Sequence, residues 1–194
     1  MDQTQKATDA PVLMDAEKIL LLKVARETLE SYLETGVTPR YDVSSTPGLL
    51  RQLPAFVTLK RKNGELKGCI GRLVVSDPLV DTVQDCAISA ATRDFRFPPV
   101  SGKAELSGLV IEISVLSPFE EIHSPEEIQI GRHGLMLRQG MNSGLLLPQV
   151  ASERNWGRHE FLRAICMKAG LPADAWRERD AHLSVFSAEI FGEE

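Results

Sequence analysis

Residues 55–71 read AFVTLKRKNGELKGCIG, two apolar runs joined by a polar segment that contains Asn63-Gly64. Asn-Gly between apolar runs is a strong short-range signal for a β-hairpin, because both central residues of a type I′ turn need a positive φ. We therefore predict an antiparallel pair of strands formed by Phe56–Leu59 and Leu66–Leu73.

A lone cysteine, Cys69, lies between Gly68 and Gly71 on the second predicted strand. Glycine weakens a strand interior and usually marks a bulge or a place where a ligand or another backbone comes close. Such a place can expose Cys69, which makes this segment the first candidate for a functional site.

The elements around the hairpin predict a mixed fold. Leu109–Leu116 alternates so that one face is wholly apolar and the other carries Glu112, as expected of a central strand. Helices are predicted from Asp15 as N-cap to about Glu34, with Gly36 as the stop, and from Ser76 to about Asp94. Because the hairpin implies antiparallel pairing, we predict an α+β protein with an antiparallel sheet flanked by helices.

The second half of the chain predicts a smaller β-rich lobe, placed around residues 128–150. Ile128–Leu137 has the pattern of a hairpin whose turn is the glycine-flanked Gly131–Gly134. A third helix is expected from about His159 to Ala169, and Leu183–Phe191 is expected to close the chain as a strand. Residues 15–194 are thus predicted to form one domain with a main lobe and this small lobe, preceded by a flexible tail at residues 1–14.

The composition is that of a globular protein: 194 residues, of which 43% are hydrophobic and 25% charged. The net charge of -5 argues against nonspecific nucleic-acid binding and against anionic membrane surfaces. The three cysteines are an odd number at wide and irregular spacing, which suits neither a disulfide framework nor a paired zinc motif. We therefore expect a cytoplasmic protein that neither binds nucleic acid nor enters a membrane.

Motifs for cofactors and metals are not recognised. No glycine-rich phosphate loop follows a predicted strand, so no cofactor is expected. None of the four histidines, at positions 123, 133, 159 and 182, forms a spaced pair that argues for a metal ion.

Several separated short motifs of the sequence resemble those of the AMME chromosomal-region candidate-gene family, whose bacterial and archaeal members are called protein A of the AmmeMemoRadiSam system. These motifs occur in the family's order, and the resemblance extends from about Ala16 to Glu189. The motifs are Leu66–Gly71, Asp94–Pro99, Glu112–Leu116, Gly131–Gly134, Leu147–Ala151 and Trp156. The resemblance implies a larger antiparallel sheet with helices and a smaller β-rich lobe. It also implies partners, namely a Memo-like protein similar to metal-dependent dioxygenases and a radical S-adenosylmethionine (SAM) protein, and a shared pathway rather than a particular reaction.

Two residues depart from the family pattern. Lys67 replaces the usual arginine, which keeps the charge but loses the planar fork for a carboxylate or phosphate. Phe95 stands where many relatives have a small residue or proline, and we expect it to alter local packing.

The catalytic candidates are Cys69, His133 and Glu112. Cys69 can act as a nucleophile or redox thiol if it is accessible and near a cation, and Lys67, two residues away on a regular strand, shares its face. The alternative is a small buried thiol at a tight packing point. His133, in its glycine-flanked turn, is the best partner for Cys69, with capping or solvent exposure as the alternative. Glu112 needs a hydrogen-bonding partner if its face is covered and can face a cleft if it is open.

The binding candidates come from the same segments and from the motifs that resemble the family. Asp94 and Arg96 can brace the Phe97-Pro98-Pro99 turn as an ion pair or anchor a substrate. The full set of binding candidates is Lys67, Gly68, Gly71, Asp94, Arg96 and Gln149.

Two classes of function follow. The first is a binding or substrate-presenting component acting with the Memo-like and radical SAM proteins, in which the glycine-cysteine segment forms a docking groove. The alternative is an enzyme that uses Cys69 on a small-molecule ligand. The sequence completes neither a catalytic triad nor a metal set, so we favour the binding component.

Overall fold

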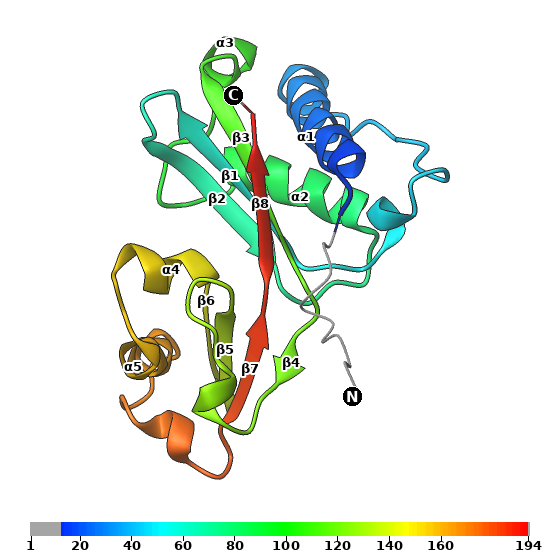
Figure 1. Cartoon of the computed structure of the whole chain (residues 1–194). Helices are drawn as coiled ribbons and strands as arrows, with labels where there is room; N and C mark the ends of the chain where they lie inside the picture. The colour runs from blue at the N-terminus through cyan, green and yellow to red at the C-terminus, as the bar shows by residue number, and fades with distance from the viewer. Residues whose placement is uncertain (1–12, 194) are drawn as a thin grey trace. The chain divides into compact units, whose positions relative to one another are not determined.

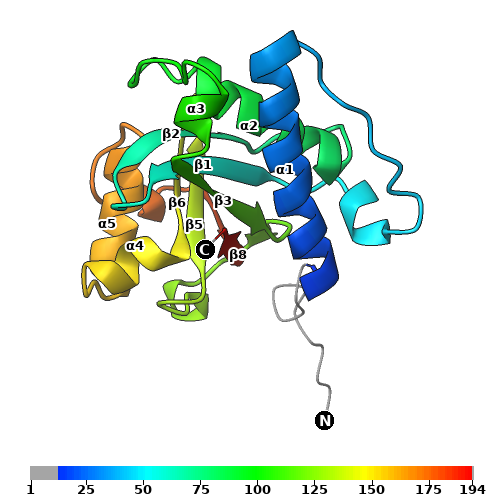
Figure 2. The same cartoon turned by 90° about the horizontal axis from the view of Figure 1, so that it is seen from above.

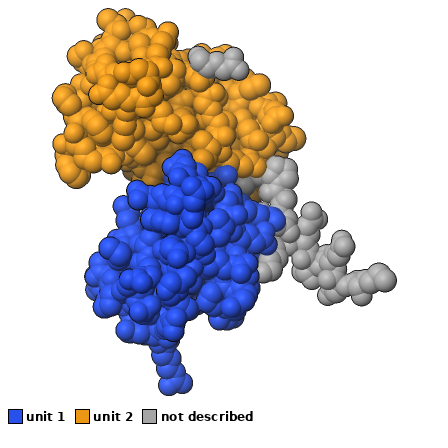
Figure 3. Space-filling view, turned by 60° about the vertical axis from the view of Figure 1, so that its left-hand side comes forward, with its two compact units in different colours: residues 1–10, 117–188 blue, residues 11–116, 189–194 orange. Residues whose placement is uncertain are grey.

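A computed structural model describes residues 13–193, which form two compact units (Figure 3). Unit 1 is Ser117–Ala188, and unit 2 contains residues 13–116 and 189–193. The predicted tail comprises residues 1–14, and residues 1–12 of it lie outside the described residues. Leu13 is buried, so the packed part of unit 2 already includes it.

Unit 2 contains one sheet of four strands in the order β2-β1-β3-β8 (Figure 1). The strands are β1 (Ala55–Arg61), β2 (Leu66–Arg72), β3 (Leu109–Leu116) and β8 (Ala188–Gly192). β1 pairs antiparallel with both β2 and β3. The prediction that the hairpin and the Glu112 strand share one antiparallel sheet is confirmed, and with it the α+β class.

Two helices cover one face of this sheet, α1 (Asp15–Thr35) and α2 (Leu79–Thr92) (Figure 2). α1 ends at Thr35 and is capped by Gly36, whose φ of 72° suits glycine, so Gly36 stops the helix as predicted. Its start differs, because Met14 is the N-cap and Asp15 the first helical residue. The unit is completed by α3 (Lys103–Leu106) and the 3-10 turn η2 (Pro47–Leu50). The core between helices and sheet includes Leu21, Val24, Val57, Leu59, Val83, Ala87, Ile111 and Ile113.

The β1–β2 turn differs from the predicted type I′ turn. Gly64 has a φ of 86°, whereas Asn63 does not have a positive φ. The Gly64 N–H donates to the Arg61 carbonyl, and the Arg61 N–H donates to the Glu65 carbonyl. This is a three-residue loop with glycine in the left-handed region.

The sheet of unit 1 has the order β4-β7-β5-β6, and its neighbouring strands pair antiparallel. Its strands are β4 (Glu120–Glu121), β5 (Gly134–Gln139), β6 (Asn142–Leu146) and β7 (His182–Phe186). The unit also contains α4 (Pro148–Glu153), α5 (Arg158–Lys168) and the 3-10 turns η3 (Pro125–Glu127) and η4 (Ala175–Arg177). It therefore covers more of the chain than residues 128–150.

Two strand predictions in the second half are wrong. Ile128–Ile130 is not a strand, and the hairpin is β5–β6, which turns at Gly140 with a φ of 56°. The run Leu183–Phe191 is not one strand of one sheet, because β7 belongs to the unit 1 sheet and β8 to the unit 2 sheet. Among the described residues, no helix combines the length and apolarity needed to cross a membrane.

Candidate functional site

Cys69, Thr58 and Glu112 form a row across three strands of the unit 2 sheet. Thr58 lies opposite Cys69 on β2 and opposite Glu112 on β3. Directly opposite residues of antiparallel strands share a face. Their chain neighbours Val57 and Ile111 point into the helix-covered core, so the row lies on the other face of the sheet.

Polar contacts tie this row together. The Thr58 hydroxyl donates to Cys69 Sγ at 3.2 Å. Lys60 Nζ lies 2.8 Å from each carboxylate oxygen of Glu112, so Glu112 has the partner that a half-buried carboxylate needs. We call Cys69, Thr58, Glu112 and Lys60 the cysteine row. Sequence reasoning missed Thr58 and Lys60, although the alternation of β1 places both on the polar face.

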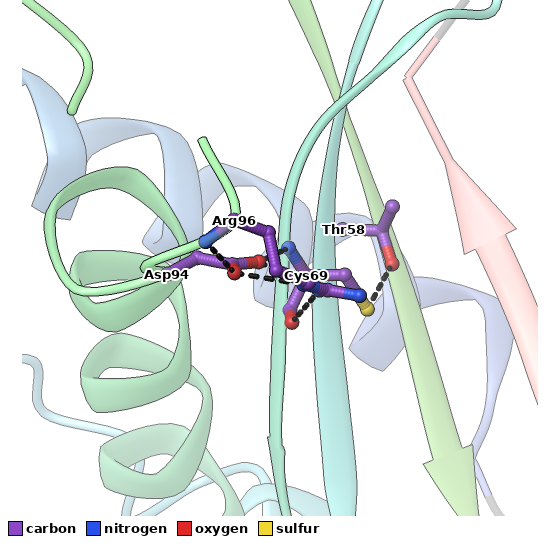
Figure 4. A network of polar contacts seen from close by, with 4 residues as sticks. All are labelled: Thr58, Cys69, Asp94 and Arg96. Carbon is purple, nitrogen blue, oxygen red and sulfur yellow. Dashed lines mark hydrogen bonds and ion pairs between the residues drawn. The ribbon is translucent and has the colours of Figure 1, made fainter. Parts of the chain in front are cut away.

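A second group holds the backbone of Cys69 from outside the sheet (Figure 4). Asp94 Oδ2 accepts the Cys69 N–H at 2.9 Å, and Arg96 Nη2 donates to the Cys69 carbonyl at 3.0 Å. Arg96 also donates to both Asp94 oxygens, from Nε at 2.9 Å and from Nη2 at 2.7 Å. β2 is an edge strand, and this pair satisfies backbone groups that a neighbouring strand would otherwise satisfy. We call Asp94 and Arg96 the edge clamp.

The edge clamp explains the contact between Thr58 and Cys69. Because the Cys69 N–H and carbonyl face the clamp, Cys69 and Thr58 form the non-hydrogen-bonded kind of antiparallel pair, whose side chains approach most closely. The clamp itself is charged, since the hydrogen bond from Arg96 holds the pKa of Asp94 well below its ordinary value. The predicted Asp94–Arg96 ion pair therefore exists, and it braces Cys69 as well as its own turn.

Lys67 is not the cation expected beside Cys69. The β1–β2 register shifts between Leu59 and Lys60, which leaves Lys67 as the extra residue of a bulge. Its Nζ lies 2.7 Å from Glu105 Oε1 of α3, and this hydrogen bond lowers the pKa of Glu105 to about 2. The premise of a regular strand was wrong, and Lys67 is buried against Glu105.

Gly68 and Gly71 leave room for neighbours inside unit 2. A Cβ at Gly68 would lie 2.1 Å from the carbonyl oxygen of Ala90 in α2, and one at Gly71 would lie 2.1 Å from the Phe56 ring. The glycines therefore mark close approaches of a helix backbone and an aromatic ring.

His133 and Gln149 belong to unit 1, so the predicted pairing of His133 with Cys69 stays a prediction. His133 is 2% exposed, which contradicts solvent exposure, and its Nδ1 accepts the Gln129 N–H at 3.3 Å, which is a capping contact. Gln149 lies in α4, and its Oε1 is buried without a hydrogen-bond partner among the described residues.

Phe95 does not alter local packing as expected, because its side chain is 96% exposed. It stands between the two residues of the edge clamp. Within residues 13–193, no group of three or more His, Cys, Asp or Glu side chains is placed to hold a metal ion.

The three cysteines differ in their environment, and we predict that Cys69 alkylates first. Cys86 and Cys166 are fully buried, and burial raises the pKa of Cys86 to about 12 and also raises that of Cys166. Cys69 is half-buried. Iodoacetamide at neutral pH followed by peptide mass spectrometry should label Cys69 in the native protein and all three thiols after denaturation. Labelling of Cys69 only after denaturation would contradict an accessible thiol.

The fold and this site define an α+β protein of two units, one of which holds a clamped cysteine on an antiparallel sheet. The family model described as AMMECR1 matches residues 22–191, and the chain belongs to that family. It is 44% identical to Protein MK0488 of Methanopyrus kandleri over 90% of this chain and 87% of that protein. It is 43% identical to Protein Mbar_A1807 of Methanosarcina barkeri, over 94% and 93% of the two chains. The crystal structure of the uncharacterised protein PH0010 from Pyrococcus horikoshii matches with a TM-score of 0.85 and 41% identity, covering 95% of each chain.

Proposed function

We propose that the protein is a binding or substrate-presenting component that acts with a Memo-like protein and a radical SAM protein, and that the cysteine row with the edge clamp is its contact surface. The observation that carries this proposal is the fixation of Cys69 from two sides. Its backbone is held by Asp94 and Arg96, and its sulfur accepts the Thr58 hydroxyl. A surface fixed before binding loses less conformational entropy on association.

The charged groups of this surface already form ion pairs with each other. Glu112 is paired with Lys60, and Asp94 with Arg96. A general base works best with a pKa near the operating pH, whereas the pKa of Asp94 lies well below it. The ion pairs and the low pKa of Asp94 support recognition by fixed groups rather than proton transfer through Asp94.

Phe95 supplies the side chain of this surface that suits a protein partner. It is exposed beside Arg96, which is itself half-exposed. Aromatic and arginine side chains are the residues that most often dominate binding energy at protein interfaces. We therefore place the partner's contact at Phe95 and Arg96.

The proposal includes a cytoplasmic location. All three cysteines are free thiols, although the chain contains enough of them for a disulfide. Free thiols persist in reducing compartments.

Phe95→Ser tests the contact surface, with Met141→Ser as the matched control because Met141 is fully exposed in unit 1. We expect Phe95→Ser to weaken association with the Memo-like or radical SAM protein about tenfold, as for an interface hot spot. Association is measured by calorimetry with each purified partner. Equal affinity of Phe95→Ser and the parent protein for both partners would contradict the proposed surface.

Cys69→Ser separates presentation from catalysis. It keeps the size of the side chain and removes thiolate chemistry. If the protein only presents a substrate, turnover by the reconstituted set of three proteins should fall in Cys69→Ser no further than the affinity for the partners falls. If Cys69→Ser abolishes turnover while both partners bind normally, the protein is an enzyme and Cys69 carries chemistry.

A further inference from the structure

Unit 1 contains a cavity of about 700 Å³ that no part of the proposed function uses. It is lined by the end of β6, by α4 with the segment that follows it, and by α5, elements that Figure 1 shows side by side. Its apolar lining includes Leu146, Val150, Trp156 and Ala164. Cavities of roughly 300–1,000 Å³ with mainly apolar walls are typical of small-molecule sites. The size suits an organic molecule rather than a single ion.

α5 divides its surface between the core and this cavity. Phe161, Leu162 and Ile165 are buried in the unit 1 core. Arg163, Ala164, Met167 and Lys168 recur at helical spacing on the cavity side. Met167 is 69% exposed there, so a flexible apolar side chain is available to cover a ligand.

The charges that line the cavity have the opposite sign to the net charge of the chain. Arg154, Arg163 and Lys168 line it, and within residues 13–193 none of the three has a carboxylate partner. Glu160 is the acidic lining residue, and its carboxylate accepts the Gly157 N–H at 3.1 Å. The chain as a whole carries a net charge of -5. The excess of positive charge at this cavity therefore favours an anion.

Arg154 is also held in position by an aromatic ring. Its guanidinium carbon lies 5.0 Å from the centroid of Trp156, a cation–π contact. Arginine presents a planar fork that matches a carboxylate or phosphate. A flat apolar group beside Trp156 would therefore lie next to the Arg154 guanidinium.

We propose that this cavity binds a small amphipathic anion, an apolar body of about the size of a fused ring system that carries a carboxylate or a phosphate. The body packs on Val150, Trp156 and Met167, and the anionic group binds the cations of the lining, Arg154, Arg163 and Lys168. The site shares no residue with the cysteine row, so its test is independent of the partner proposal. An acidic peptide is the competing occupant, and the concave apolar lining favours the small molecule over it.

Three matched probes test the proposal on the full chain by titration calorimetry. Naphthoate and naphthyl phosphate combine one apolar body with a carboxylate or a phosphate, and naphthalenemethanol carries no charge. We expect at least one of the anions to bind with one-to-one stoichiometry and the alcohol to bind at least tenfold more weakly. The stronger of the two anions identifies the anionic group that the site prefers.

Variants assign the binding to the cavity. Arg163→Ala and Lys168→Ala should each weaken the anion about tenfold. Arg179→Ala, which removes an exposed cation of unit 1 outside the cavity lining, should leave the affinity unchanged. The proposal is overturned if neither anion saturates, if the alcohol binds equally well, or if the cavity variants behave like Arg179→Ala. A hexaglutamate peptide that binds more tightly than both anions would assign the surface to acidic peptides instead.

Discussion

Replacing Asp94 with alanine should lower the free energy of unfolding by about 2–3 kcal/mol, because a buried acceptor and the partner of a charge are removed together. The Asp94 side chain is 2% exposed and accepts the Cys69 N–H as well as three N–H groups of Arg96. Without it the Cys69 N–H loses its acceptor and Arg96 loses its counterion. Arg96 is 49% exposed, so water compensates part of the loss, which keeps the expected value below that of a fully buried pair.

Urea unfolding followed by far-ultraviolet circular dichroism measures this loss, since α1 and α2 both lie in unit 2. Trp156 and Trp176 lie in unit 1, so tryptophan fluorescence serves as the internal reference. Hydrogen exchange supplies a local check, because the Cys69 amide should lose protection in Asp94→Ala. A protected Cys69 amide in this variant would show that Asp94 does not hold the strand edge.

The same contacts predict how stability depends on pH. The pKa of Asp94 is lower in the folded than in the unfolded state, so its contribution is complete above the unfolded value of about 3.9 and is lost as pH falls below it. Asp94→Asn should therefore lose less stability than the parent protein between pH 5 and pH 2, because the parent loses the contribution of the charged Asp94 progressively over this range. Asp15→Asn is the control, because the Asp15 side chain is 96% exposed. Equal acid sensitivity of Asp94→Asn and the parent would contradict the charged clamp.

The sheet of unit 2 could be predicted from the sequence because its signals are local. Alternation in Leu109–Leu116 and the Asn63-Gly64 turn determine strands, their faces and their antiparallel pairing. The same turn placed Cys69 on a strand, and the glycines around it indicated close packing. What alternation cannot show is the bulge at Lys67, which reverses the expected direction of that side chain.

The edge clamp could be predicted only in part. The spacing of Asp94 and Arg96 suggested an ion pair, but their bonds to Cys69 join a loop to a strand 25 and 27 residues away in the chain. Side-chain bonds to a distant backbone leave no periodic pattern in a sequence. In unit 1, Gly131 and Gly140 both have a positive φ, so local backbone conformation alone does not distinguish the predicted turn at Gly131 from the β5–β6 turn at Gly140.

Gly68→Ala should lower the free energy of unfolding by about 3 kcal/mol, at the upper end for an overpacked site. The added Cβ would lie 2.1 Å from the Ala90 carbonyl oxygen and 3.1 Å from its carbonyl carbon. Both atoms belong to the backbone of α2, so a change of side-chain rotamer cannot remove the clash. The helix must move away from β1 and β2, on which it packs.

Two other glycine variants separate this clash from the general effect of replacing glycine. Gly71→Ala meets the side chain of Phe56, which is half-buried and can rotate, so we expect a loss of about 1 kcal/mol. At Gly108 the nearest atom to an added Cβ is the Glu105 carbonyl oxygen at 3.5 Å, an ordinary contact, and Gly108→Ala should change stability by less than about 0.5 kcal/mol. The expected order of losses in urea unfolding is therefore Gly68, Gly71, Gly108. If Gly68→Ala is no less stable than Gly108→Ala, then α2 does not pack on β2 at Gly68, and the glycine before the motif cysteine serves some purpose other than the approach of this helix.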